Sequence, residues 1–383
     1  MYSHLSVFFR ERKFVAIGFV FSINALLFAF WITRIPEVKI TLGLSDGRLG
    51  AALFFMPIGA LLAMLSVSAL VQRFGAGKVT IGTGVLYIAC IFLPFISNSF
   101  WMLAGSLFFV GLTSGAMDIA MNAVASILEK DHKTDIMSSC HGFFSLGGMI
   151  GAGVGSLLIA LSVSGVLQIL VGMGLMLLLL LFVAKPAIYN IKEARSTEES
   201  HFALPGKALF GLAIVAFCSM QGEGGVADWS AVYMGQIVQA EEYMWGLAFT
   251  GFSMSMTLVR FAGDSIVARV GSQRVILLAS LVVVVGLVLV LPATGWLSIA
   301  GFTISGISYA LLVPVVFAEA GRQPVVSPSR GIAAVATVGY FGFLVGPVLI
   351  GGIAEWFGLK TGFIYLMVFT LLALIAFRVI ERK

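Results

Sequence analysis

Residues 72–79 read QRFGAGKV, and a similar run of basic residues and glycine returns at residues 268–275, which read ARVGSQRV. Residues of the two halves match in pairs. Most pairs are separated by one constant number of positions, and the last two by two positions more. The pairs are Arg73 with Arg269, Gly75 with Gly271, Lys78 with Arg274, Gly50 with Gly246, Trp31 with Trp229, and Phe143 with Phe341. Such a long-period match indicates an internal duplication. In a membrane chain it predicts two parallel bundles related by an axis along the membrane normal, with a solute site between them.

The composition indicates a polytopic membrane protein. Of 383 residues, 60% are hydrophobic and 11% are charged, and the mean hydropathy is +1.06, whereas soluble domains carry about 25% charged residues. Roughly a dozen spans of about 20 residues use up this length, so no soluble catalytic domain is expected. The net charge of +5 is the usual result of basic cytoplasmic loops and does not indicate a nucleic-acid partner.

Twelve apolar runs predict twelve transmembrane helices. Their approximate ranges are 14–34, 47–71, 78–97, 101–128, 138–162, 165–184, 208–235, 243–268, 274–292, 296–318, 330–353 and 359–378. If the N-terminus is inside, most loop Lys and Arg lie on one side, and the other side keeps only Arg34, Lys39, Arg48 and Lys360. The positive-inside rule then predicts cytoplasmic termini in a bacterial inner membrane.

The expected fold is an all-α membrane protein with two six-helix bundles. The polar segment 185–207 divides the chain into an N-terminal bundle (1–184), a cytoplasmic linker (185–207) and a C-terminal bundle (208–383). The first apolar run has no small-residue cleavage pattern after it and is expected to remain as the first span. Three cysteines without CxxC spacing, Cys90, Cys140 and Cys218, are expected to be small buried hydrophobes.

The turn at 72–79 resembles the signature G-x-L-A-D-R-x-G-R-K of the major facilitator superfamily, with Ser68 in place of the first glycine and Gln72 in place of the acid. Further segments resemble the MosC/YbjJ-like branch: MDIAMNA (117–123), CHGFFSLGGMIGA (140–152), EGGVADWSAVYM (223–234), RFAGD (260–264) and GYFGFLVGPVLIGG (339–352). The resemblance implies the major facilitator fold and secondary transport by alternating access, without a cofactor. A rhizopine-locus member of the branch implies small polar solutes of sugar or inositol type.

Asp118 and Asn122 lie one helical turn apart inside the apolar run 101–128. A carboxylate in a bilayer costs several kcal/mol, so it must be hidden from lipid or used. His141, in the first turn of the next helix, is expected at a similar depth to Asn122. The three residues therefore predict a proton-coupling or substrate-binding site. The alternative is that Asp118 bonds to neighbouring groups and only locks the bundle.

Two observations bear on that choice. Gly111 and Gly115 precede the acid at four-residue spacing and leave one helix face bare, either for close packing or for a solute. In the second half of the repeat Asp118 corresponds to Val313 and Asn122 to Phe317. A polar pair that served architecture alone would be expected in both halves, so this asymmetry favours a functional role.

The seventh helix contains QGEGGVADWSAVY (221–233). Gln221 and Glu223 stand among three glycines, which predicts a broken or flexible helix whose freed carbonyls line a cavity. Glu223 is then a second acidic group for coupling or substrate binding, and Gln221 a further binding residue. The alternative is that Glu223 satisfies the broken backbone.

Asn24, Trp31 and Arg34 occupy the first helix, which corresponds to the seventh in the repeat. Arg34 could pair with Asp228 across the outer mouth as a gate, or it could extend toward the lipid headgroups. Trp31 and Trp229 could stack on a sugar ring, or they could belong to the interfacial aromatic belt.

At the inner side, Arg260 and Asp264 are spaced i, i+4 and predict an intrahelical ion pair at an inner gate, together with Arg73 and Arg269 of the matched turns. A direct role of Arg260 and Asp264 in substrate binding is the alternative. Pro57, Pro314 and Pro347 are expected to mark kinks.

An enzyme is not expected, because the sequence has no HExxH, no paired-aspartate motif and only one histidine, His141, inside a span. No catalytic or metal-binding residues are predicted. The expected partners are a small-molecule solute, protons and the lipid bilayer, around a monomeric protein. Efflux of drugs or metabolites by proton antiport, and a non-transporting sensor of the same fold, remain as alternatives.

Overall fold

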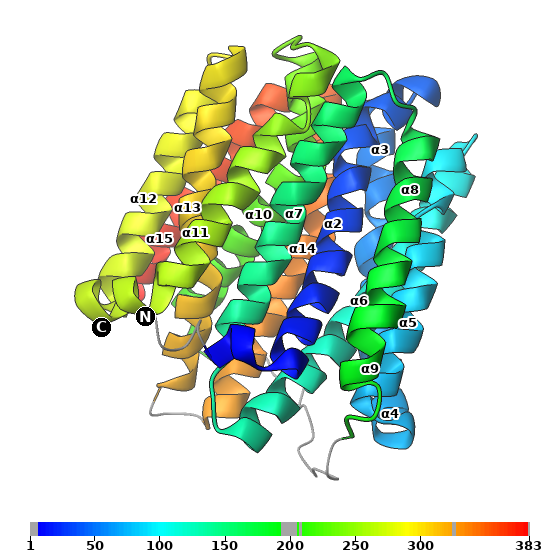
Figure 1. Cartoon of the computed structure of the whole chain (residues 1–383). Coiled ribbons are helices and arrows are strands. Elements are labelled where there is room, and N and C mark those ends of the chain that lie inside the picture. Colours follow the sequence, from blue (N-terminus) through cyan, green and yellow to red (C-terminus); the bar gives the residue numbers. More distant parts are fainter. Residues whose placement is uncertain (1–6, 193–204, 207–208, 324–326, 382–383) are drawn as a thin grey trace. The chain divides into compact units, whose positions relative to one another are not determined.

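The computed structural model describes residues 7–192, 205–206, 209–323 and 327–381, and these contain helices and no strands. The helices follow one another along the chain as long rods joined by short turns (Figure 1). The principal elements are α2 (Arg12–Thr41), α3 (Asp46–Leu53), α4 (Phe55–Phe74), α5 (Ala76–Cys90), α6 (Phe100–His132), α7 (Met137–Ala160), α8 (Gly165–Leu178), α9 (Lys185–Ile188), α10 (Phe210–Gln236), α11 (Leu247–Val270), α12 (Ser272–Val290), α13 (Gly295–Gly321), α14 (Pro328–Phe357) and α15 (Leu359–Glu381). Short 3₁₀ segments lie at Leu93–Ile96 and Glu242–Met244, and a π-helical segment, η2, lies at Leu179–Ala184.

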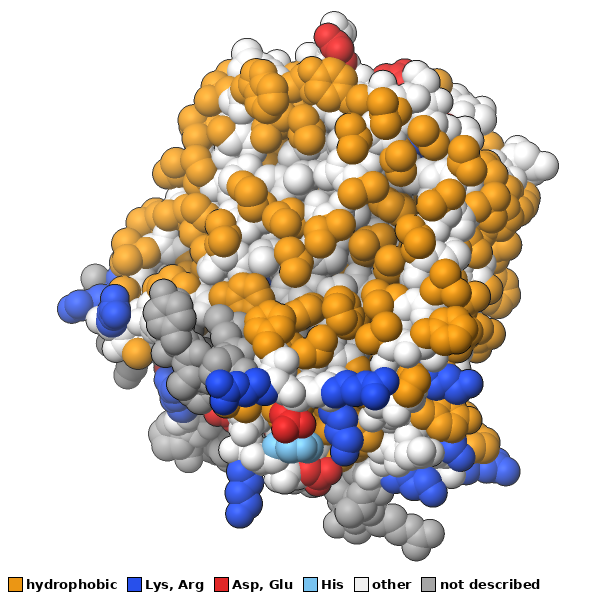
Figure 2. All heavy atoms as spheres, viewed as in Figure 1, with side chains coloured by type: hydrophobic (Ala, Val, Ile, Leu, Met, Phe, Trp, Pro, Cys, Tyr) orange, Lys and Arg blue, Asp and Glu red, His pale blue; other side chains and the backbone are white. Residues whose placement is uncertain are grey.

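Among the described residues, eleven helical stretches are long and apolar enough to cross a membrane. The helix α11 is not one of them, although it has 24 residues. It carries Arg260, Asp264 and Arg269, which lower its apolar character. On the face drawn in Figure 2, hydrophobic side chains cover most of the surface, and Lys and Arg gather toward the lower end.

The chain divides into two contact units, the first made of Met1–Leu44 and Ala51–Thr197, the second of Ser45–Gly50 and Glu198–Lys383. In the first unit the main helix pairs are α2 with α7, α4 with α6, and α5 with α6. Figure 1 shows α2 beside α7. In the second unit the main pairs are α10 with α14, α11 with α13, and α12 with α13. Each unit therefore repeats the same scheme of internal packing.

Among the candidate spans of each unit, one helix is more enclosed than the others. In α2 and in α10, 72% of the most apolar stretch is buried, against 22% for the stretch containing α4 and for the one containing α8. The exposed apolar side chains of α4 and α8 suit contact with lipid, because a helix that faces hydrocarbon keeps its apolar residues outside. Polar residues on α2 and α10 are therefore held among other helices of their own unit.

The prolines have different effects on their helices. The predicted second span is interrupted at Phe54, between α3 and α4. Pro57 explains this break, because it lacks the N–H that would bond to the carbonyl of Leu53. Pro314 and Pro347 lie inside α13 and α14, which continue through them.

Candidate functional site

The glycine face of α6 is occupied by α4. A Cβ atom added at Gly111 would collide with the backbone of Met56, and one added at Gly115 would lie 2.9 Å from the Cα of Ala60. Of the two uses expected for this face, close helix packing is the one that the structure contains. The absence of side chains lets the two backbones approach, as small residues do in membrane helices.

Asp118 and Asn122 continue this stretch of α6 toward its C-terminal end. The Asn122 amide Nδ2 donates to the Asp118 carbonyl at 2.9 Å and lies 3.3 Å from the carboxylate Oδ1. Both side chains are half-buried. Among the residues that the structure describes, Asp118 has no ion pair. Its carboxylate therefore has an amide partner and no compensating positive charge.

His141 lies in the first turns of α7, as expected. Its ring packs edge-on against Phe21 of α2, with centroids 5.4 Å apart. A contact between His141 and Asp118 stays a prediction.

Asn24 joins three helices of the first unit. Its amide Nδ2 lies 3.3 Å from the Ser114 hydroxyl of α6, which in turn can donate to the Asn24 Oδ1. The Tyr87 hydroxyl of α5 donates to the Asn24 carbonyl at 2.9 Å. Asn24 is only 4% exposed, so in this structure it ties α2 to α5 and α6.

The helix α10 is continuous from Phe210 to Gln236, so the prediction of a broken helix at the glycine cluster is wrong, while a flexible helix there stays a prediction. The three glycines instead make room for large side chains of neighbouring helices. Gly222 lies against the Tyr309 hydroxyl of α13, and a Cβ at Gly224 would lie 2.7 Å from Phe343 of α14. At these two positions the missing side chain leaves space for an aromatic ring. The helix itself continues through the glycines.

Gln221 points into the interior of the second unit. The Tyr365 hydroxyl of α15 donates to its Oε1 at 3.1 Å. Among the described residues, neither its Nε2 nor the Tyr309 hydroxyl has a hydrogen-bond partner, and both atoms are buried. Buried donors without acceptors are uncommon and suit an ordered water or a polar ligand.

Glu223 and Arg260 form an ion pair between α10 and α11. Arg260 Nη2 donates to Glu223 Oε1 at 3.4 Å, and the side chains are 15% and 22% exposed, respectively. The sequence predicted Asp264 as the partner of Arg260. The Asp264 side chain lies outside the described residues, so that pairing stays a prediction. Glu223, unlike Asp118, has a cation beside it.

Trp31 and Trp229 occupy matched positions in the repeat and have no exposed surface. Each indole N–H is buried, with no acceptor in the part of the chain that the structure describes. The expectation that they belong to an interfacial aromatic belt is therefore wrong, because belt residues reach the headgroups. Stacking on a solute stays a prediction, and it would require the enclosing side chains to move.

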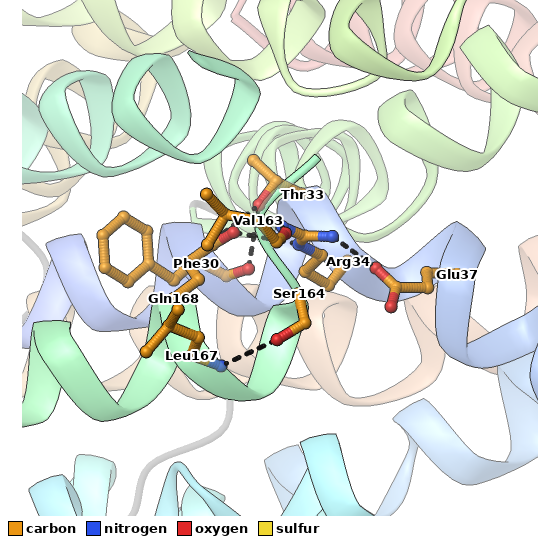
Figure 3. A network of polar contacts seen from close by, with 8 residues as sticks. All are labelled: Phe30, Thr33, Arg34, Glu37, Val163, Ser164, Leu167 and Gln168. Carbon is orange, nitrogen blue, oxygen red and sulfur yellow. Dashed lines mark hydrogen bonds and ion pairs between the residues drawn. The ribbon is translucent and has the colours of Figure 1, made fainter. Parts of the chain in front are cut away.

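Arg34 is the centre of a buried polar network at the end of α2 (Figure 3). Its Nε donates to Gln168 Oε1 at 2.9 Å, its Nη2 to the Val163 carbonyl at 2.6 Å, and its Nη1 to Glu37 Oε2 at 2.6 Å. Arg34 is 6% exposed, so the expectation that it extends toward the headgroups is wrong. Its guanidinium holds α2 to the turn before α8 and to α8 itself.

Asp228 is half-buried on α10. Its predicted pairing with Arg34 would join the two contact units and stays a prediction. Each of the three guanidinium nitrogens of Arg34 already donates to an acceptor within the first unit.

The two matched turns begin in the same way. Gly75 has a φ of 94° and Gly271 a φ of 84°, values that favour glycine because a Cβ would be strained there. Arg73 lies over the Phe74 ring, 5.2 Å from its centroid, and Arg269 is exposed. The two turns share this backbone geometry, which explains why glycine recurs in both. A gating role for the arginines stays a prediction.

Two sets of polar side chains with partners in the structure were not predicted from the sequence. The Glu129 Oε1 accepts the backbone N–H groups of Ile136 and Met137, each at 2.7 Å, and so caps the start of α7. Tyr309 and Tyr365 place hydroxyls beside α10. The signal for the tyrosines was a phenol inside an apolar span, which usually needs a hydrogen-bond partner.

Among the described residues, no three or more His, Cys, Asp and Glu side chains are grouped so that they could hold a metal ion.

Comparisons with known proteins agree with this architecture. The model of the Major Facilitator Superfamily matches residues 14–324. An uncharacterized MFS-type transporter of Yersinia pestis is 32% identical over 356 residues, which cover 91% of each chain. The membrane protein MosC of Rhizobium meliloti is 29% identical over 362 residues, which cover 94% of this chain and 88% of MosC.

Two solved structures share the fold. The nucleoside transporter NupG has a TM-score of 0.77 at 15% identity, covering 96% of this chain and 99% of that one. A bacterial homologue of the human lysosomal transporter Spinster, in an inward-facing and occupied conformation, has a TM-score of 0.69 at 12% identity, with 96% of each chain covered. At such identities the likeness concerns the fold alone.

Proposed function

Because the chain belongs to the major facilitator superfamily and to its MosC-like branch, it is a membrane transporter and not an enzyme, and we propose that it moves a small polar solute of sugar, inositol or metabolite type by proton-coupled alternating access. We place it in a bacterial inner membrane with twelve spans and cytoplasmic termini. The twelfth span is α11, whose 24 residues correspond to about 36 Å of helix, enough to cross a hydrocarbon core of about 30 Å.

The contrast between two carboxylates carries the proton-coupling proposal. Glu223 has Arg260 as a counter-ion within 3.4 Å, whereas Asp118 has only the amide of Asn122. An unpaired charge at the centre of a spanning helix costs about 3 kcal/mol, and protonation removes that charge. Asp118 is therefore the better proton carrier, and His141 is the group that could exchange a proton with it.

The Glu223–Arg260 pair has a different role in this proposal. A charged pair offers a carboxylate acceptor and guanidinium donors side by side, which suits the hydroxyl groups of a polar solute. The two members are partly exposed and paired at 3.4 Å, a distance long enough for a solute to compete. We assign solute binding to this pair, with coupling left to Asp118.

The first test identifies a ligand. Purified protein in detergent is screened by thermal shift against sugars, inositols, amino sugars, nucleosides, amino acids and cationic drugs, because a ligand that binds the folded state raises its stability by mass action. Stabilisation by polyols or sugars supports the proposal. Stabilisation only by hydrophobic cations would replace it with drug efflux.

The second test concerns coupling. Proteoliposomes containing a pH-sensitive dye should acidify or alkalise when the ligand is added to wild type. Asp118→Asn should abolish this proton movement and retain exchange of labelled solute, whereas Asp131→Asn, an exposed acid on the same helix, should behave like wild type. Proton movement at the wild-type rate in Asp118→Asn would rule out its coupling role.

A further inference from the structure

A cluster of cations lies where the start of α5 meets α9 in the first unit. The backbone N–H of Gly77 donates to the Ile191 carbonyl at 3.0 Å, and Gly77 also touches the Ile188 carbonyl. Because Gly77 has no side chain, the segment after α9 can approach α5 this closely. The contact fixes the neighbouring Lys78 beside the residues of α9.

Two lysines from different helices share one aromatic ring. Lys78 Nζ and Lys185 Nζ each lie 5.6 Å from the centroid of Tyr189. Lys192 comes close to the same turn, since a Cβ added at Gly75 would lie 2.9 Å from its Cγ. We call Lys78, Lys185, Tyr189 and Lys192 the basic cluster.

This cluster has no internal counter-charge. Among the described residues, none of its three lysines has a carboxylate partner. Gln72 stands where the superfamily signature has an acid, and the first turn of α5 contains no acidic residue. The N-terminus of α5 adds the positive end of a helix dipole. Among the described residues, the three lysines therefore lie together without a carboxylate beside them.

The cluster lies at the edge of the apolar surface. On α4 the exposed side chains include Leu65, 82% exposed, and Phe74. In η2, Phe182 is 70% exposed and directly precedes the turn that carries Lys185. Along both segments, lipid-facing residues are followed by cations within one or two turns. We expect this transition to lie at the depth of the lipid headgroups.

We propose that the basic cluster binds the phosphate of an anionic phospholipid headgroup. A headgroup phosphate would lie between the ammonium groups of Lys78 and Lys185, and its acyl chains would follow the exposed apolar surface of α4 and η2. Clusters of Lys and Arg beside a membrane helix attract anionic lipid by this combination of charge and depth. Tyr189 keeps the two ammonium groups together before the lipid arrives.

In the second unit an acid lies near the matched turn. There Arg322 Nη1 pairs with Glu319 Oε1 at 3.0 Å and lies 3.3 Å from the Ser272 hydroxyl. An acid is therefore present at that turn, and the proposal applies to the first unit alone.

The test uses the purified full chain and native mass spectrometry. The protein is titrated with phosphatidylglycerol or with phosphatidylcholine of the same acyl chains. Wild type should retain phosphatidylglycerol in preference. The variant Lys78→Gln/Lys185→Gln should reduce that retention roughly thirtyfold, because each lysine near the surface contributes separately. Lys78→Arg/Lys185→Arg should restore it.

The control variant removes two positive charges from the other unit. Arg274→Gln/Arg378→Gln neutralises two exposed cations of the second unit and should retain phosphatidylglycerol as wild type does. Equal losses in both double variants, or no loss in either, would overturn the proposal. Glycerol 3-phosphate distinguishes a free phosphate from a lipid. If it displaces phosphatidylglycerol at equal concentration, the cluster is a site for soluble phosphate and the lipid assignment is wrong.

Discussion

Arg34 donates through Nε to the Gln168 side-chain oxygen at 2.9 Å, from α2 to α8, and both residues are buried. Replacing Arg34 by Met keeps most of the side-chain volume and removes the donors to Gln168 and to the Val163 carbonyl. The buried Gln168 oxygen and the half-buried Val163 carbonyl then lose this donor, at a cost of up to about 1–3 kcal/mol for each acceptor left without a partner. We expect a clearly lower thermal midpoint in detergent.

The matched control for this network is Glu37→Gln. Glu37 is the most exposed partner of Arg34, with 46% of its side chain accessible, and glutamine keeps an oxygen acceptor. The expected loss is below about 1 kcal/mol, as for exposed ion pairs. If Arg34→Met unfolds at the same temperature as wild type, the network does not stabilise the unit.

Glu129 should stabilise the start of α7 through its Oε1, which accepts two backbone N–H groups. Glu129→Ala leaves both donors without this acceptor and should cost about 1 kcal/mol, as the loss of a helix cap does. Glu129→Gln keeps an oxygen in place and should cost less. Hydrogen exchange at Ile136 and Met137 is the direct measurement, and it should accelerate in the alanine variant only.

Exchange that accelerates equally in both variants would mean that the negative charge, and not the oxygen acceptor, holds the turn. Unchanged exchange in both would show that the cap is dispensable.

The sequence was sufficient for features that depend on local spacing and hydropathy. The one-turn separation of Asp118 and Asn122 follows from helix geometry alone, and their hydrogen bond is present. The partner of Arg34 was not predictable in this way, because Gln168 lies 134 residues further along the chain. The glycines at 222 and 224 indicated missing side chains, but only the packed helices reveal that Tyr309 and Phe343 fill the space.

The approach of α6 to α4 predicts a large difference between two glycines of one helix. A Cβ at Gly111 meets the backbone of Met56, which has little freedom to move, whereas a Cβ at Gly105 meets nothing within 4 Å. Gly111→Ala should therefore destabilise the protein by about 1–3 kcal/mol through overpacking. Gly105→Ala should be neutral or stabilise by up to about 1 kcal/mol, since alanine restricts the unfolded chain.

The measurement for this pair is the thermal midpoint, together with the fraction of protein recovered as a single species in detergent. Equal effects of the two substitutions would contradict the close contact between α6 and α4.

Glu223 and Arg260 predict non-additive effects on stability. Glu223→Gln removes the carboxylate that lies 3.4 Å from Arg260. Arg260→Gln removes the cation beside Glu223 and leaves a carboxylate in the span, at about 3 kcal/mol for an unpaired charge. The double variant Glu223→Gln/Arg260→Gln removes both charges and should unfold closer to wild type than either single variant. Transport of the ligand found by thermal shift should be lost in all three, because the pair supplies the polar groups that bind the solute.

If the double variant transports the solute at the wild-type rate, the pair acts only on stability, and the solute must bind through other groups. Additive losses of stability would instead mean that the contact at 3.4 Å contributes little, and that each charge is compensated separately.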